Sequence, residues 1–263
     1  MSDDETVFAV HGLTRLFGRG TSLVRAVDGI DLRIPAGQRL GIVGESGSGK
    51  STLVRMLLAL LAPTSGEIQF LGKSIVGRRE AELATLRRNV QMVFQDPRSS
   101  LDPRRSIGHA ITEPLRSRIW RGLPRPEPRT RLAEVLTQVG LEPGDARRFP
   151  HEFSGGQRQR IAIARALAPN PRVLIADEAV SALDVSVRAQ VLNLILDLVA
   201  GHGLTLLLVS HDLAVVRHLC DRVVVLRQGG IVEAGSIEQV YRDPQHPYTR
   251  ELLAAVPQIR FGR

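Results

Sequence analysis

A glycine-rich stretch that begins at residue 44 has the pattern G-x-x-x-x-G-K-S, whose residue types and spacing suit the binding of a phosphate chain. The glycines let the backbone curl so that its N–H groups point inward toward phosphate oxygens. Lys50 can reach the β- and γ-phosphates of a nucleotide, and the Ser51 hydroxyl can bind Mg²⁺. We therefore expect a nucleoside triphosphate to bind here with Mg²⁺. The stretch comprises Gly44, Glu45, Ser46, Gly47, Ser48, Gly49, Lys50, Ser51 and Thr52.

The segments on either side are those that a phosphate loop requires. The apolar run 39–43 predicts a buried strand, and residues 52–62 are rich in Leu, Met and Ala without a breaker, which predicts a helix. The alternative is a glycine-rich turn with a surface lysine. A strand before the loop and a helix after it favour the phosphate loop, because the positive end of that helix then faces the bound anion.

Two adjacent carboxylates, Asp177 and Glu178, follow the apolar strand predicted at 172–176. They could be two solvated acids, but a buried strand rarely ends in paired acids without a chemical reason. Beside a phosphate loop, Asp177 can hold Mg²⁺ together with Ser51, and Glu178 can orient the attacking water. The pair therefore predicts hydrolysis of the bound nucleotide.

Polar side chains also follow two other predicted strands. Gln95 comes at the end of the strand at 90–94, where α/β sheets meet their ligands, so it is a candidate contact for the γ-phosphate or Mg²⁺. His211 follows the strand at 204–209 and can hydrogen-bond to the γ-phosphate while holding Glu178 and its water in line. We expect these strand ends to converge on the phosphate loop.

Two further binding residues are suggested by their position. Ser154 and two glycines open a helix predicted at 161–167, which makes a second anion site. Phe17 lies just before the glycine- and serine-containing loop 18–22 and could stack on an adenine ring. A phenylalanine can equally be a core residue, so the sequence leaves both interpretations of Phe17 open.

The composition is ordinary for a soluble globular protein with a substantial core, since 24% of the 263 residues are charged and 43% are apolar. The single cysteine, Cys220, excludes an internal disulfide and a cysteine-based metal site. No apolar run is long enough to cross a bilayer, and the acidic start at 3–5 lacks the features of a signal peptide. We therefore expect any role at a membrane to depend on a partner.

The net charge of +8 comes mostly from arginines between residues 104 and 148. Such a basic patch could bind nucleic acid or an anionic membrane surface. Apart from Trp120, no aromatic residues are interleaved with it for base stacking, so a solvated face turned toward lipid headgroups is the better interpretation. Proline breaks and helical patterns at 107–118 and 129–139 indicate that residues 96–150 form a helical insertion into the sheet domain.

Taken in chain order, these motifs resemble those of ATP-binding-cassette (ABC) ATPases. The resemblance covers roughly residues 7–240. It rests on six motifs, which are the phosphate loop, Gln95, the signature Ser154–Gln157, the pair Asp177–Glu178, the segment Ser-Ala-Leu-Asp at 181–184 and His211.

The resemblance implies an α/β fold of the P-loop NTPase type. A RecA-like core with an antiparallel β-subdomain would comprise residues 1–95 and about 160–240, and an α-helical subdomain would be inserted at about 96–157. Residues 1–242 would form one ABC ATPase domain that binds ATP and Mg²⁺. A short C-terminal extension would follow at 243–263.

The resemblance also implies that two cassettes, identical or paralogous, close head-to-tail. The signature of one cassette would then contact ATP on the phosphate loop of the other, with Asp184 near the dimer seam. This arrangement would use the second anion site, which one nucleotide in one chain would leave without a function. The signature residues are Ser154, Gly155, Gly156 and Gln157.

Several stretches look like the oligopeptide, dipeptide and nickel importer branch of this family, among them 94–97 (FQDP), 151–160 (HEFSGGQRQR) and the tail 243–249 (DPQHPYT). Members of that branch power membrane permease subunits fed by an extracytoplasmic solute-binding protein, which implies a peripheral position on the cytoplasmic face of the membrane. The sequence departs from the family at Ala179, where proline usually follows the catalytic glutamate. Both carboxylates are retained, so an active site is still predicted. The transported substrate is not encoded here, because its recognition belongs to the permease and the binding protein.

Two other functions stay open. A cassette that acts on nucleic acid or ribosomes would usually carry two cassettes, zinc-binding cysteines or a long coiled coil. This chain has one phosphate loop and one cysteine, and the segment between Gln95 and Ser154 is too short for a coiled coil, so we expect no nucleic-acid partner. The other possibility is an exporter ATPase. Only the resemblance of the signature and the tail to those of importers argues against it.

Overall fold

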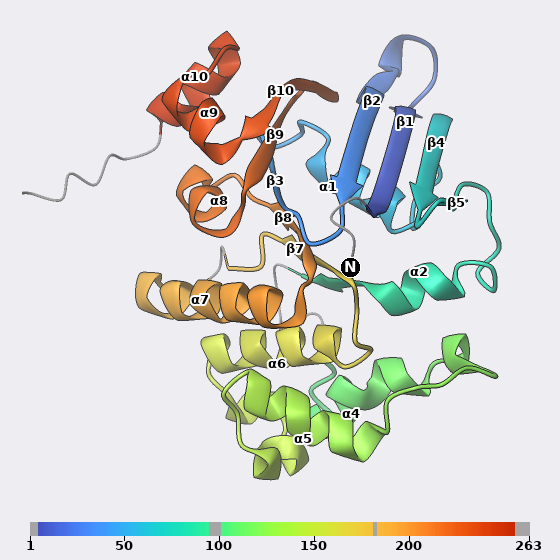
Figure 1. Cartoon of the computed structure of the whole chain (residues 1–263), viewed down its shortest axis with the longest axis vertical. Helices are drawn as coiled ribbons and strands as arrows, with labels where there is room; N and C mark the ends of the chain where they lie inside the picture. Colours follow the sequence, from blue (N-terminus) through green and yellow to red (C-terminus); the bar gives the residue numbers. More distant parts are fainter. Residues whose placement is uncertain (1–4, 95–100, 181–182, 256–263) are drawn as a thin grey trace, which may run out of the picture. The chain divides into compact units, whose positions relative to one another are not determined.

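The computed structural model describes residues 5–94, 101–180 and 183–255 (Figure 1). The chain divides into two compact units. The first unit combines Met1–Gly77 with Leu207–Arg263, and the second is Arg78–Leu206.

The first unit contains a four-stranded antiparallel sheet with strand order β2-β1-β4-β5. Phe8 of β1 lies opposite Ile34 of β2 and Phe70 of β4. All three side chains are buried, and the ring centroids of Phe8 and Phe70 are 5.1 Å apart, so one face of the sheet contributes to the core. This confirms the predicted antiparallel β-subdomain. Its elements are β1 (Thr6–Phe17), the 3-10 helix η1 (Gly20–Ser22), β2 (Val24–Pro35), β4 (Ser65–Phe70) and β5 (Lys73–Ser74).

A second set of strands in the same unit leads into the phosphate loop. The predicted strand at 39–43 is β3, which runs parallel to β9, and β9 turns into antiparallel β10 through Gln228 and Gly229. Both turn residues have positive φ (48° and 86°), as a two-residue hairpin requires. The elements are β3 (Arg39–Val43), α1 (Lys50–Leu57), α8 (Leu213–Leu219), β9 (Arg222–Arg227), β10 (Gly230–Ser236), α9 (Ile237–Arg242) and α10 (Pro247–Ala254).

The helix after the phosphate loop is shorter than the segment 52–62 predicts. It ends at Leu57 because Ala59 adopts a left-handed conformation with a φ of 49°. The backbone N–H of Leu60 then donates to the Arg55 carbonyl oxygen at 2.9 Å, which satisfies one of the last carbonyls of α1. A glycine usually occupies such a position, so the sequence carried no signal for this helix end.

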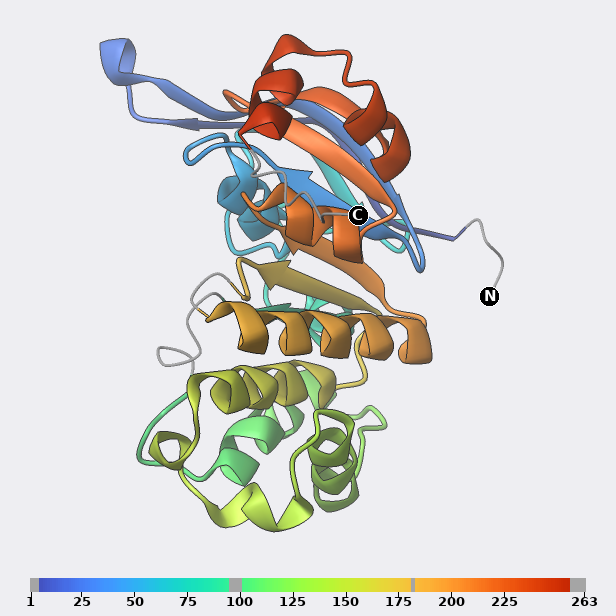
Figure 2. The same ribbon diagram turned by 90° about the vertical axis from the view of Figure 1, so that its left-hand side faces the viewer.

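The second unit is built on two parallel strands, β6 and β7, with Val90 opposite Val173. Residues 173–176 of β7 are fully buried, in agreement with the predicted strand at 172–176. The helices α6 and α7 lie side by side in both views (Figures 1 and 2). The main elements are α2 (Ala84–Asn89), β6 (Val90–Val93), α4 (Ile107–Thr112), α5 (Pro128–Gln138), α6 (Gly155–Leu167), β7 (Val173–Asp177), α7 (Val185–His202) and β8 (Thr205–Val209), whose last residues enter the first unit.

The helix predicted at 107–118 is interrupted. The α-helix α4 ends at Thr112, because Pro114 has no N–H to continue the hydrogen-bond ladder. The Trp120 indole donates to the Pro114 carbonyl oxygen at 3.1 Å, which fixes the return of the chain. The chain continues in 3-10 turns η2 (Glu113–Arg116) and η3 (Arg118–Trp120), and further 3-10 turns are η4 (Pro143–Arg147) and η5 (Pro150–Glu152).

Candidate functional site

Two glycines of the phosphate loop lie where no side chain fits. A Cβ on Gly44 would be 2.2 Å from the Leu226 carbonyl oxygen of β9, and a Cβ on Gly49 would be 2.2 Å from the Ala26 carbonyl oxygen of β2. Both glycines also have positive φ, 150° and 106°. The loop is therefore packed directly against the backbones of two strands, which requires glycine at both positions.

Lys50 lies inside the curl of this loop. Its side chain is 7% exposed, and its Nζ donates to the carbonyl oxygens of Gly44 and Glu45, both at 2.7 Å. These bonds hold a positive charge against the loop backbone, where charge-assisted hydrogen bonds to a phosphate are strong. Gly49 is the N-cap of α1 and provides no side-chain cap, so the first N–H groups of α1 suit a bound anion. Ser51, which follows Lys50, is exposed.

His211 lies two residues after the end of β8, in the same unit as the phosphate loop. The backbone N–H of Ser210 donates to the Ile42 carbonyl oxygen of β3 at 3.3 Å, so the chain just before His211 lies beside the strand that leads into the loop. The Asp212 carboxylate caps α8 and the Asp212 N–H donates to Ser210 Oγ at 2.9 Å. His211 itself is exposed, as a residue that contacts a ligand must be.

Phe17 is the last residue of β1 and its side chain is 39% exposed. The interpretation of Phe17 as a core residue is therefore wrong. The guanidinium of Arg15 lies 4.6 Å from the ring centroid, so one side of the ring is covered by a cation. The alternative interpretation, in which the exposed Phe17 ring stacks on an adenine, stays a prediction.

The predicted Mg²⁺ ligand Asp177 and the predicted catalytic Glu178 lie at the end of β7 in the second unit. Asp177 is the last residue of the strand and is half-buried, and Glu178 follows it, also half-buried. Glu178 has a φ of 46°, a left-handed conformation that is strained for a residue with a side chain. The buried strand before it and Ala179 after it, which is 2% exposed, hold this conformation. Strained backbone of this kind is often found at catalytic residues.

The signature residues form the start of α6. Ser154 is the N-cap, and its Oγ accepts from the Gln157 N–H at 3.3 Å while the Gln157 side chain accepts from the Ser154 N–H at 3.0 Å. Helix α6 therefore begins at Gly155, six residues before the predicted helix at 161. Ser154, Gly155 and Gln157 are exposed, whereas Gly156 is buried against α7.

Asp184 is the N-cap of α7. Its carboxylate accepts from the Val187 N–H and from the Ser186 hydroxyl, both at 2.9 Å. The Val187 hydrogen bond, followed by that from Ser186, lowers the pKa of Asp184, so this exposed side chain is a carboxylate at neutral pH. The Asp184 carboxylate thus lies at the surface of the second unit.

The structure groups the predicted residues by unit. The first unit brings together the phosphate loop and the strand end at His211, and the second unit carries the carboxylate pair, the signature and Asp184. Gln95 lies outside the described residues, as do residues 181 and 182. Across 5–94, 101–180 and 183–255, no group of three or more His, Cys, Asp or Glu side chains could hold a metal ion.

One contact of the phosphate loop was not predicted. The backbone N–H of Glu45 donates to the hydroxyl of Tyr248 at 2.9 Å, although the two residues are 203 positions apart. The only sequence signal for this residue was the tail motif at 243–249, which indicated a family and no contact.

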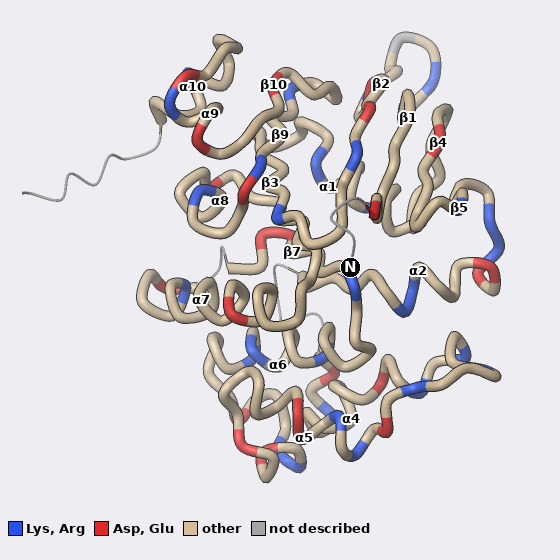
Figure 3. Tube along the Cα trace, in the orientation of Figure 1, with Lys and Arg blue, Asp and Glu red and all other residues tan. Residues whose placement is uncertain are grey.

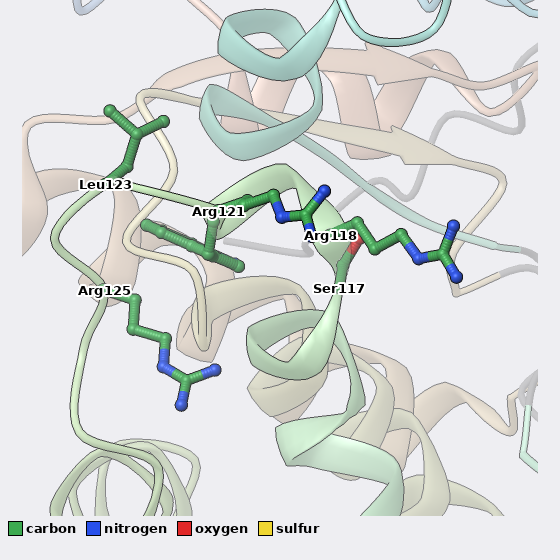
Figure 4. A pocket seen from close by; sticks show the side chains of 6 residues that line it. Ser117, Arg118, Arg121, Leu123 and Arg125 are labelled. Carbon is green, nitrogen blue, oxygen red and sulfur yellow. The ribbon is translucent and has the colours of Figure 1, made fainter.

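The arginine-rich part of the second unit is a mixed surface. Acidic residues are interspersed among the arginines in the part of the chain around α4 and α5 in Figure 3, and ion pairs such as Arg148–Asp145 and Arg165–Glu113 join them. A pocket of about 420 Å³ lies on η3 and the segment after it, and in Figure 4 Arg125 points in a different direction from Arg118 and Arg121. These guanidinium groups do not converge on one anion, which agrees with a solvated face.

The chain matches two family descriptions. Residues 27–181 match the family described as "ABC transporter", and residues 232–263 match "Oligopeptide/dipeptide transporter, C-terminal region". Similar curated proteins include the oligopeptide transport ATP-binding protein OppD of Mycobacterium tuberculosis, 54% identical over 240 residues, and the glutathione import ATP-binding protein GsiA of Escherichia coli, 52% identical over 262 residues. These alignments cover 91% and 97% of this chain but 39% and 42% of the two proteins, so the chain spans about two fifths of the length of these relatives.

The chain also resembles solved structures of ABC cassettes over nearly their full length. The ATP-binding cassette MJ0796, in a dimeric post-hydrolysis state bound to ADP and Pi, has a TM-score of 0.76 and 32% identity, over 88% of this chain and 98% of that one. The cbiO1 protein of Clostridium perfringens, part of the ABC transporter complex cbiONQ, has a TM-score of 0.80 and 30% identity, over 91% of this chain and 92% of that one. Both likenesses agree with the fold class expected from the sequence, a P-loop NTPase with an antiparallel β-subdomain and an inserted helical segment.

Proposed function

Because this chain belongs to the ABC transporter family, we propose that it binds ATP with Mg²⁺ and hydrolyses it to drive uptake of a peptide or similar small solute. The observation that carries the proposal is the phosphate loop folded around Lys50, on a chain whose C-terminal region matches that of oligopeptide and dipeptide transporters. Relatives named for oligopeptide transport and glutathione import support this class of solute.

Nucleotide binding would depend on the first unit. The loop N–H groups and the uncapped first turn of α1 would donate to the phosphates, and Lys50 would supply positive charge at the β- and γ-phosphates. The exposed ring of Phe17 would stack on the adenine. His211 would hydrogen-bond to the γ-phosphate.

The donor chemistry of the chain fits Mg²⁺. The Ser51 hydroxyl and the Asp177 carboxylate are oxygen ligands, which Mg²⁺ prefers, and the side-chain oxygen of Gln95 would be a third. Mg²⁺ usually keeps several waters and binds substrate phosphates, so few protein ligands suffice. When bound, the ion would offset the negative charge that develops on the phosphates.

Hydrolysis would depend on Glu178. Its carboxylate would orient or deprotonate the attacking water, and the strained backbone after β7 would hold the carboxylate in one direction. Lys50 and His211 would stabilise the charge of the transition state, and Gln95 would sense the γ-phosphate.

We propose that the working form is a head-to-tail pair of cassettes, identical or paralogous. The exposed residues Ser154, Gly155 and Gln157 at the start of α6 would face the nucleotide of the partner cassette, and Asp184 would lie near the seam. The dimeric state of MJ0796 supports this arrangement.

The partners would be membrane permease subunits and, through them, an extracytoplasmic solute-binding protein. In the part of the chain that the structure describes, no helix is both long and apolar enough to cross a bilayer. By its resemblance to importer ATPases, we propose that the chain acts as a peripheral subunit on the cytoplasmic face of the membrane.

The test is ATP hydrolysis by the purified chain, alone and with co-expressed permease subunits. We expect turnover to rise strongly with the permease, and the Glu178→Gln variant to lose at least 99% of it while still binding ATP, since general-base catalysis contributes about 10²–10⁴-fold.

The matched control is Glu238→Gln, which removes an exposed carboxylate in the first turn of α9 and should retain normal turnover. Turnover that survives in Glu178→Gln would contradict the role of Glu178. Turnover that responds to nucleic acid and ignores the permease would contradict the transport function.

A further inference from the structure

The C-terminal region reaches the phosphate loop through one tyrosine. Tyr248, in the first turn of α10, is 2% exposed, and its hydroxyl oxygen accepts a hydrogen bond from the Glu45 N–H at 2.9 Å. Glu45 is the second residue of the loop. Its carbonyl oxygen in turn accepts from Lys50 Nζ at 2.7 Å. A continuous line of hydrogen bonds therefore joins α10 to the phosphate-binding lysine.

The ring of Tyr248 is held on β9. The guanidinium of Arg227, the last residue of β9, lies 4.7 Å from the ring centroid. The preceding residue, Leu226, places its carbonyl oxygen where a Cβ on Gly44 would collide. The start of the loop is thus packed against β9 at Gly44 and bonded to Tyr248 at Glu45.

The segment that carries Tyr248 is clamped to β10. The Glu233 carboxylate accepts the backbone N–H of Gln245 at 2.8 Å and that of His246 at 3.1 Å. His246 is the N-cap of α10, and its Nδ1 accepts from the Tyr248 N–H at 3.2 Å, while Pro247 occupies the first helical position. All of these residues lie in the stretch that matches the oligopeptide/dipeptide C-terminal region.

We propose that Tyr248 is a positioning residue that holds the phosphate loop in its nucleotide-binding form, so that the C-terminal region sets the affinity of this cassette for ATP. The hydroxyl accepts from the N–H of the peptide that joins Gly44 to Glu45. The carbonyl oxygen of the same peptide, that of Gly44, accepts from Lys50 Nζ at 2.7 Å, so the hydroxyl fixes a peptide that orients the ammonium. Without the hydroxyl, the first turn of the loop samples more conformations, and binding must restore one of them. This inference rests on the proposed binding of ATP.

The test is the Tyr248→Phe variant of the full chain, which retains the ring and its contact with Arg227 but removes the hydroxyl. We expect the Kd for Mg-ATP, measured by isothermal titration calorimetry, to rise three- to tenfold, as the loss of one hydrogen bond predicts. The KM for ATP should rise by a similar factor, and kcat at saturating ATP should stay within twofold. Hydrogen exchange of the backbone amides of the loop should become faster in the nucleotide-free protein.

The matched control is Tyr241→Phe. Tyr241 is the other tyrosine of the chain, and its hydroxyl donates to the Leu213 carbonyl oxygen, away from the loop. This variant also loses one tyrosine hydrogen bond, so it should leave the Kd for ATP and the exchange of the loop amides unchanged.

Lys50→Ala separates this inference from the proposed function. If Lys50→Ala abolishes ATP binding and Tyr248→Phe binds like the wild type, the positioning role is overturned and the phosphate loop stands. If Lys50→Ala binds ATP normally, the proposed function itself fails. Equal effects of Tyr248→Phe and Tyr241→Phe would show a general loss of stability and would also overturn the positioning role.

Discussion

At the scale of single residues, the backbone is strained at the residue that we propose as the catalytic base. Glu178 is a left-handed glutamate between a buried strand and the buried Ala179. Such a conformation costs about 1–3 kcal/mol and persists only where the surroundings enforce it. A proline after this glutamate is usual in the family, and in this chain the burial of Ala179 and Val180 restrains the backbone in its place.

Glu178→Gly should therefore stabilise the protein while it removes catalysis. Glycine adopts positive φ without steric cost, so we expect the free energy of unfolding to rise by about 1 kcal/mol. ATP turnover should fall at least a hundredfold, because the carboxylate is lost. Urea denaturation and an ATPase assay measure the two effects.

Glu178→Gln is the control, because it removes the charge but keeps a side chain at the same φ. It should lose turnover without gaining stability. A Glu178→Gly variant that is less stable than Glu178→Gln would mean that the left-handed backbone is not strained.

At the scale of the elements, the two neighbouring glycines at the start of α6 differ in how closely other atoms surround them. A Cβ on Gly156 would lie 2.3 Å from Val187 Cγ1 of α7, whereas a Cβ on Gly155 would meet only Leu183 Cδ2, at 4.0 Å. Gly156 therefore serves the close packing of α6 on α7. Gly155 is exposed, so its packing does not require glycine.

Gly156→Ala should destabilise the protein and Gly155→Ala should not. The collision with Val187 should lower the free energy of unfolding by about 1–3 kcal/mol, the usual cost of overpacking. Alanine at Gly155 should be neutral or stabilising by up to about 1 kcal/mol, because it favours the helix. Chemical denaturation of both variants checks this.

Val187→Ala combined with Gly156→Ala is the decisive double variant. Because it removes the colliding methyl groups, it should recover part of the lost stability, which is a non-additive effect of two residues in contact. Strictly additive losses would mean that the two helices do not meet at Gly156.

How much the sequence could predict depends on the range of the interaction. The phosphate loop and the strand before it are encoded by neighbouring residues, so their pattern was sufficient. The early end of α1 was not predictable, because Ala59 takes a conformation for which the sequence offers no glycine. The contact of Tyr248 with Glu45 was not predictable either, since it joins a loop and a helix whose contacting residues are 203 positions apart in the sequence.

At the scale of the whole molecule, the first unit carries the phosphate loop with its C-terminal support, and the second carries the signature and the carboxylate pair. In the proposed pair of cassettes, the exposed start of α6 would contact the nucleotide of the partner cassette. The nucleotide would then be part of the interface between two chains.

Such a pair would associate only when ATP is bound. With hydrolysis blocked by Glu178→Gln, we expect Mg-ATP to convert the single chain into a particle of about twice its mass, measured by light scattering after size-exclusion chromatography. Mg-ADP should leave the chain single, because it lacks the γ-phosphate that the signature is proposed to contact.

Adding Gly155→Arg to Glu178→Gln should prevent association without weakening ATP binding, since the arginine would block the exposed start of α6 far from the chain's own phosphate loop in sequence. A single-chain mass at every ATP concentration would contradict a pair of identical cassettes, and co-expression with a paralogous cassette would then be the way to recover the dimer.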